Sequence, residues 1–168
     1  LGEHGRRRAT VASSDGAPVR ASNGVEVAVG SSLAAERQKM VGHERPSMVI
    51  VCGGLNIEDY NNKTVFAWLR EEYNRGVAIG GLCTAAYVLA GAGLLTDRRC
   101  AIHWENLPGF AERYPRANVF ADLFETEANI YTCAGGTAAM DMMLKLIGED
   151  FDESLINRVC EQLLTDRV

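Results

Sequence analysis

A cysteine stands between small residues where one hydrophobic pattern gives way to another. In Gly81-Leu82-Cys83-Thr84-Ala85, the positions two before and two after Cys83 are both small. This is the spacing of a nucleophile elbow, a sharp strand-to-helix turn that forces its central residue into a strained backbone conformation. The side chain would project at the start of the following helix, whose dipole favours a thiolate. The pattern predicts a reactive thiol, and the open alternative is a buried cysteine that packs as a small hydrophobic residue.

Two other loops should lie beside Cys83. In open, mostly parallel α/β sheets, ligands bind at the carboxyl ends of the strands, where these loops begin. They are Cys52-Gly53-Gly54 and Cys133-Ala134-Gly135-Gly136. In the first loop, Gly53 and Gly54 would let backbone N–H groups approach a ligand oxygen, as in an oxyanion hole. The alternative for this loop is a plain tight turn.

A histidine follows the predicted strand in Arg98-Arg99-Cys100-Ala101-Ile102-His103-Trp104. His103 could contact Cys83 and act as its base. The alternative is a histidine hydrogen-bonded near the surface. Cysteines end three of the predicted strands, but we expect no metal site there, because small apolar residues are simply useful where loops converge. We expect no cofactor either.

The five cysteines also bear on the compartment. They lie at positions 52, 83, 100, 133 and 160, and no two have the CxxC spacing of a zinc or redox site. Scattered single cysteines are typical of a reducing cytoplasm, so we expect a cytoplasmic protein without a disulfide framework.

Hydrophobic periodicity predicts the elements that must position these residues. An asparagine of the pair Asn61-Asn62 should cap an amphipathic helix that ends at Gly76, and a short helix should lie within 31–43. The apolar run at 47–54 indicates a parallel strand buried on both faces, and 137–147 a largely buried helix. Further strands are predicted at 77–81, at 98–104 and two or three times within 118–136, with further helices at 84–90, 105–115 and 151–165.

Strands that alternate with helices predict an α/β fold with an open, mostly parallel, doubly wound sheet of the flavodoxin-like type. A length of 168 residues suits a single domain spanning 1–168. Such a sheet usually opens with an apolar strand and a helix, whereas this chain opens with a polar tail. We therefore expect the first strand and helix to be missing here or to be replaced by other residues.

Composition excludes some classes of function. A net charge of −5 argues against a nucleic-acid-binding surface, which needs clustered Lys and Arg. No apolar run approaches the roughly 20 residues that span a bilayer, so we expect no membrane partner.

With the elbow, the double glycine and the His-Trp pair identified, the chain resembles the ThiJ/PfpI-like group of the class I glutamine amidotransferase-like superfamily. More closely, it resembles the sensor domain of GlxA-type regulators of the AraC family. The resemblance spans residues 10–166, through PVRASNGVEV, VIVCGG, GLCTAAYVLAGAGLL, AIHW, FAERYP and CAGGTAAMDMMLKLI. The segment CGGLNIEDY is also similar to regulators of carnitine and glycine betaine breakdown.

The chain departs from the family pattern in three ways. Family hydrolases often place His directly after the cysteine, where this chain has Thr84. The acidic partner of the cysteine usually comes from the first strand or helix, which we expect this chain to lack. Regulators of this type continue into a helix-turn-helix region, whereas this chain stops at Val168. DNA binding would therefore belong to a domain absent from this chain, and the resemblance implies a homodimer.

The resemblance implies a domain that senses a small-molecule effector without catalysis. The effector would lie over Cys83, and the backbone of Gly54, Leu55 and the helix start at Thr84 would hold an anionic group. His103 and Trp104 would form a wall.

A quaternary amine such as carnitine or glycine betaine would need aromatic faces, since it cannot donate hydrogen bonds. Trp104, Tyr60 and Tyr87 are the candidates, although such residues more often serve in packing.

Two alternatives stay open. One is a cysteine-dependent amidase or glyoxalase-like enzyme, in which Cys83 attacks a carbonyl and His103 acts as the base. The other is a redox sensor that works through oxidation of Cys83.

Overall fold

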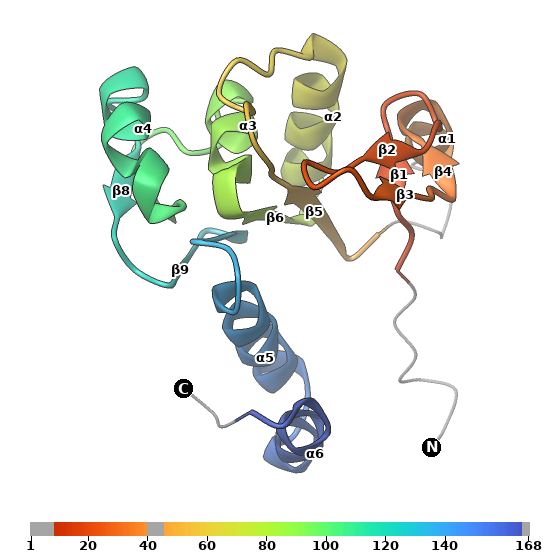
Figure 1. Ribbon diagram of the computed structural model, residues 1–168, viewed down its shortest axis with the longest axis vertical. Helices are drawn as coiled ribbons and strands as arrows, with labels where there is room; N and C mark the ends of the chain where they lie inside the picture. The colour runs from red at the N-terminus through yellow and green to blue at the C-terminus, as the bar shows by residue number, and fades with distance from the viewer. Residues whose placement is uncertain (1–8, 40–45, 166–168) are drawn as a thin grey trace. The chain divides into compact units, whose positions relative to one another are not determined.

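Two compact units, Leu1–Pro46 and Ser47–Val168, make up the chain in the computed structural model, which describes residues 9–39 and 46–165 (Figure 1). The N-terminal unit pairs two short parallel strands and adds a short hairpin and a helix. Its elements are β1 (Ala12–Ser13), β2 (Val19–Arg20), β3 (Glu26–Val27), β4 (Ser31–Ser32) and α1 (Leu33–Lys39). The helix predicted within 31–43 is therefore present, and its last predicted residues lie outside the described ones.

The C-terminal unit is the α/β part of the chain. Its elements are β5 (Met48–Cys52), α2 (Lys63–Asn74), β6 (Ala78–Leu82), α3 (Ala86–Gly91), β7 (Arg99–Ala101), α4 (Leu107–Arg113), β8 (Asn118–Phe120), β9 (Phe124–Glu127), β10 (Ile130–Cys133), α5 (Ala138–Asp150) and α6 (Glu153–Leu163). A four-stranded sheet has the order β5-β6-β10-β9, in which only β9 is antiparallel to its neighbour. This confirms the prediction of an open, mostly parallel sheet between helices.

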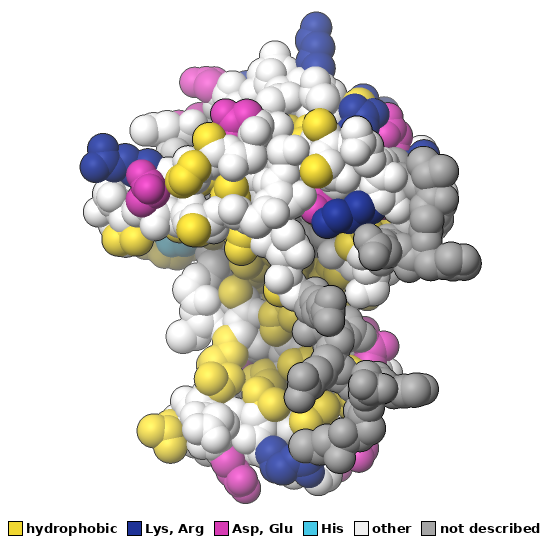
Figure 2. Space-filling model, turned by 90° about the vertical axis from the view of Figure 1, so that its right-hand side faces the viewer, with side chains coloured by type: hydrophobic (Ala, Val, Ile, Leu, Met, Phe, Trp, Pro, Cys, Tyr) yellow, Lys and Arg dark blue, Asp and Glu magenta, His cyan; other side chains and the backbone are white. Residues whose placement is uncertain are grey.

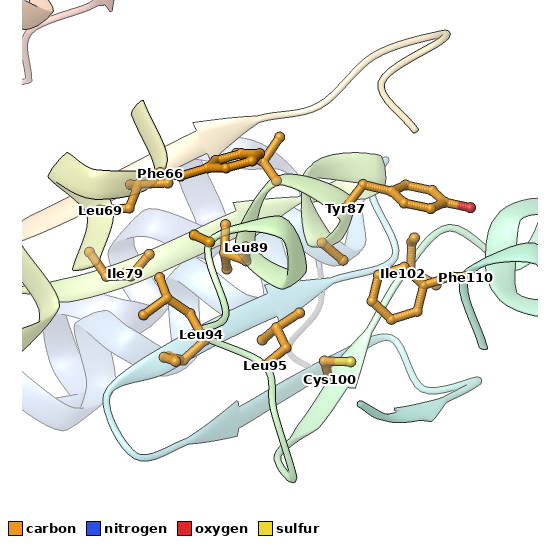
Figure 3. Packing of buried hydrophobic residues seen from close by; sticks show 14 residues of the cluster. Phe66, Leu69, Ile79, Tyr87, Leu89, Leu94, Leu95, Cys100, Ile102 and Phe110 are labelled. Atoms are coloured by element: carbon orange, nitrogen blue, oxygen red, sulfur yellow. The ribbon is translucent and has the colours of Figure 1, made fainter. Parts of the chain in front are cut away.

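Helices cover both faces of this sheet, with α2 and α3 on one face and α5 on the other (Figure 1). The alternation of strand side chains explains the arrangement. Ile79 of β6 packs with Leu69 of α2 and Leu89 of α3, whereas Leu82, three residues further on, packs with the α5 side chain Met142. Figure 3 shows the larger of these clusters, in which side chains from α2, β6, α3, β7 and α4 converge.

The helix α2 begins as its sequence predicts. The Asn62 side chain accepts hydrogen bonds from the backbone N–H groups of Thr64 and Val65, at 3.1 and 3.2 Å. Gly76, with φ +85°, follows the end of the helix in a conformation that glycine adopts without strain. The cap sets where α2 starts, and so fixes the length of the loop between β5 and α2.

A second, two-stranded parallel sheet, β7-β8, adjoins β9 and β10 through side chains. The N–H of Arg99 donates to Glu127 Oε2 at 2.6 Å, and the N–H of Ala101 donates to Thr132 Oγ1 at 2.8 Å. Glu127 pairs with the first residue of β10, and Thr132 lies two residues further along that strand. Strand β7 therefore runs in the same direction as β10, and the residues that follow both strands lie at the same edge.

Two predictions about burial are wrong. The strand β5, expected to be buried on both faces, is an edge strand of its sheet within the described residues, and Ile50 is 38% exposed. The helix α5, expected to be largely buried, has only Ala138, Met142 and Leu144 fully covered. It rests one face on β9 and β10 and packs against α6 elsewhere, so its remaining residues are partly or fully exposed.

Hydrophobic side chains also gather over α5 and α6, in the lower part of the view in Figure 2. The large exposed ones in this region are Phe151, Leu163 and Leu164. Within the described residues, no helix combines the length and the apolar character needed to cross a bilayer.

Candidate functional site

The elbow predicted at Cys83 is present. Leu82 ends β6 in an extended conformation, and Cys83 follows with φ +61°, in the left-handed region that a non-glycine residue rarely adopts. A 3-10 turn, Cys83–Ala85, leads directly into α3. A left-handed cysteine at a strand end costs about 1–3 kcal/mol and persists only where its surroundings hold it in place.

The loop after β5 holds the elbow from one side. The N–H of Gly53 donates to the Leu82 carbonyl oxygen at 3.2 Å, and the Thr84 hydroxyl donates to the Gly54 carbonyl oxygen at 2.7 Å. A Cβ at position 53 would lie 2.4 Å from the Ala85 nitrogen, so only glycine permits this approach. The predicted double glycine therefore lies directly beside the elbow.

The loop after β10 holds the elbow from the other side. Gly135 has φ +92°, and a Cβ built there would lie 2.8 Å from Cys83 Cβ and 3.0 Å from Cys83 Sγ. The sequence placed this loop at the correct edge but assigned no role to Gly135. No local pattern could have revealed this contact, since it joins residues 52 positions apart in the sequence.

His103 and Trp104 follow β7 at the same edge of the sheet. The His103 Nδ1 atom lies 3.8 Å from Glu105 Oε2, and the His103 and Trp104 ring centroids are 5.8 Å apart. The Trp104 side chain is 70% exposed. Among the described residues, no hydrogen bond joins His103 to Cys83. An exposed aromatic surface therefore lies beside His103.

The remaining candidates divide into exposed and buried residues. Leu55 is exposed, and so is Tyr60, whose ring packs edge-on to Phe66 with centroids 6.1 Å apart. Tyr87 is buried in the core, with its ring 5.2 Å from that of Phe110, and burial raises the pKa of its hydroxyl. Of the three aromatic candidates, Tyr87 is thus a packing residue.

The three cysteines at the strand ends differ in exposure. Cys52 is exposed, Cys83 is half-buried and Cys133 is buried. Within residues 9–39 and 46–165, no group of three or more His, Cys, Asp or Glu side chains is placed to hold a metal ion.

Comparisons with known proteins agree with this geometry. The model of the DJ-1/PfpI family matches residues 3–149. The HTH-type transcriptional regulator CdhR of Pseudomonas aeruginosa is 39% identical over 158 residues, which cover 94% of this chain and 45% of that protein. The regulator GbdR of the same species is 38% identical over 120 residues, covering 71% of this chain and 33% of that protein. The chain thus spans less than half the length of these curated relatives.

A comparison with a solved structure extends the similarity from sequence to fold. The crystal structure of an AraC family transcriptional regulator from Pseudomonas putida superimposes with a TM-score of 0.79 at 29% identity, covering 92% of this chain and 80% of that one. The predicted resemblance to the ThiJ/PfpI-like sensor domains of AraC-type regulators is therefore confirmed. The family model covers most of the chain, and the chain belongs to the DJ-1/PfpI family.

Proposed function

We propose that this chain is the effector-sensing part of a transcriptional regulator and that it binds a small metabolite over Cys83. The observation that carries the proposal is the elbow itself. Its cysteine has a strained backbone, Gly135 approaches it directly, and Gly53 approaches the residues on either side of it. The elbow lies at the carboxyl end of β6, where ligands of such sheets bind, and the exposed Trp104 ring follows β7 at the same edge. The likeness to HTH-type regulators supports the same proposal.

The effector class follows from the groups in the loops that follow β5 and β7. The exposed Trp104 ring offers a face to a cation, and Tyr60 offers a second aromatic surface. The backbone of the loop at Gly54 and Leu55 would hold an anionic group. A small zwitterion with a quaternary amine and a carboxylate, such as carnitine or glycine betaine, combines both features.

DNA binding, in this proposal, belongs to a helix-turn-helix domain outside these residues, and the regulator acts as a homodimer in the cytoplasm. Sedimentation equilibrium of the complete regulator tests the dimer. A monomer at micromolar concentration would contradict it.

Thermal unfolding with a panel of metabolites tests the effector. The panel contains carnitine, glycine betaine, dimethylglycine and free amino acids. A ligand at 100 times its dissociation constant adds about 2.7 kcal/mol and should raise the midpoint by about 5 to 10 °C. A selective shift without product formation supports the sensor. A flat panel with the complete regulator overturns it.

An enzyme is the second candidate, because a left-handed, half-buried cysteine is also the geometry of an activated nucleophile. The variant Cys83→Ser separates the two. It should leave effector affinity within about threefold if Cys83 only lines the pocket, and should abolish amidase or glyoxalase turnover if Cys83 attacks the substrate.

A further inference from the structure

We infer that Gly135 is a positioning residue, whose backbone decides where the Cys83 thiol can lie. A methyl group at position 135 would approach the Cβ, Sγ and Cα atoms of Cys83 to 2.8, 3.0 and 3.2 Å. Non-bonded carbon atoms prefer about 3.5–4.0 Å, so no side chain fits unless Cys83 moves. The absence of a Cβ at this position is what lets Sγ rest against the loop.

This loop is held at both ends. The N–H of Ala134 donates to the Leu123 carbonyl oxygen at 2.8 Å, and the carbonyl oxygen of Gly135 accepts from the N–H of Ala138 at 3.2 Å. The loop therefore lies as a fixed wall between β10 and the start of α5. Cys83 has little backbone freedom of its own, since Gly53 and Gly54 hold the other side of the elbow. The thiol direction is then set by the wall.

The inference goes beyond the proposed function, because it holds whether Cys83 lines a sensor pocket or acts as a nucleophile. Its test reads the thiol directly and needs no effector. A failed effector panel and a failed test of Gly135 are thus distinguishable.

The adjacent glycine provides a matched control. Gly136 also has a positive φ, +57°, but a Cβ there would meet no atom within 4 Å. Gly135→Ala and Gly136→Ala both place alanine in a left-handed conformation, and only the first meets Cys83. Any difference between the variants beyond backbone strain therefore reports the contact with Cys83.

The first readout is the rate at which iodoacetamide alkylates Cys83. Trypsin releases residues 76–98 as a peptide with Cys83 as its sole cysteine, so mass spectrometry follows this thiol alone. Gly135→Ala should change the alkylation rate at least about fivefold relative to Gly136→Ala. The methyl group displaces Sγ and so changes how far the thiol is exposed to the reagent. Equal rates in the two variants overturn the inference.

A double-mutant cycle with Cys83→Gly gives the second readout. This change removes the Cβ and Sγ atoms that a methyl at 135 would meet. The loss of unfolding midpoint caused by Gly135→Ala should shrink by at least about half in the Cys83→Gly background, while the effect of Gly136→Ala stays the same. If Gly135→Ala alone does not fold, the double variant should fold. A cycle without coupling, or a double variant that fails to fold while Cys83→Gly folds, overturns the inference.

Discussion

The Thr84 hydroxyl donates a 2.7 Å hydrogen bond to the carbonyl oxygen of Gly54, and thereby ties the residue after the elbow to the loop that follows the neighbouring strand. Thr84 is buried, and the bond is partly shielded from water. The Thr84 side chain thus holds the two loops together.

The variant Thr84→Val tests how much this hydrogen bond contributes to stability. Valine has nearly the same shape but leaves the Gly54 carbonyl oxygen without its partner, which should lower the free energy of unfolding by about 1–2 kcal/mol. Urea unfolding measures the loss, and Thr84→Ser, which keeps the hydroxyl, is the control. A Thr84→Val variant as stable as the unaltered chain would show that the bond contributes nothing.

The elbow could be predicted from sequence because its requirement is local. Small residues two before and two after Cys83 are needed by the turn itself, and the capping of α2 by Asn62 is likewise a short-range pattern. The contact of Gly135 with Cys83 could not be predicted, because it depends on which strands become neighbours.

The exposure of Ile50 escaped sequence reasoning for a related reason. An apolar run predicts a strand but not its place in the sheet, and an edge strand and a central strand can share one composition. The junction of β7 with β10 was equally hidden, since side chains replace the ladder hydrogen bonds that a strand pattern implies. Sequence thus predicted the elements and their order, while the contacts between distant residues came only from the fold.

The junction of β7 with β10 gives a second prediction. Ala101 is fully buried, and its N–H donates to Thr132 Oγ1 at 2.8 Å. Thr132→Val would leave this N–H buried without an acceptor, at a cost of about 1–3 kcal/mol. Urea unfolding should show the loss, and amide hydrogen exchange at Ala101 should accelerate. Thr132→Ser should restore both values, and a failure of serine to do so would point to the lost methyl rather than the hydrogen bond.

The pairing of Arg99 with Glu125 makes the free energy of unfolding depend on pH. Its guanidinium donates hydrogen bonds of 2.9 and 2.7 Å to Glu125 and holds the pKa of that carboxyl below its usual value of 4.5. Stability from a carboxyl with a depressed pKa is fully present above the unfolded value and is lost as pH falls through the folded value. Glu125→Gln should therefore cost about 1 kcal/mol at pH 7 and flatten the loss of stability below pH 4.5.

The neighbouring Asp122 should behave in the opposite way. Its hydrogen bond with Glu125 raises the pKa of Asp122, so the charged form of Asp122 is disfavoured in the fold. Asp122→Asn should leave the chain at least as stable at pH 7, and this variant serves as the control for Glu125→Gln. Urea midpoints between pH 3 and 7 measure both, and equal losses in the two variants would contradict the assignment.

The last prediction concerns Glu72, whose side-chain carboxyl group is buried on α2. Within the described residues, neither of its oxygens has a hydrogen-bond partner. Arg75 Nη1 lies 3.8 Å from Oε1, too far for a hydrogen bond. Burial of a charge without hydrogen bonds is costly, and its replacement by an apolar side chain of similar volume often stabilises.

Glu72→Met should therefore raise the free energy of unfolding by about 1–2 kcal/mol, measured by urea unfolding. The exposed residue Glu112, changed to Met on α4, should alter it by less than about 0.5 kcal/mol. The indole N–H of Trp68, one turn earlier on α2, is also buried and meets no acceptor in the part of the chain that the structure describes. If Glu72→Met destabilises the chain while Glu72→Gln does not, the side chain at position 72 accepts a hydrogen bond in solution. The indole N–H of Trp68, four residues earlier on the same helix, is then the donor to test.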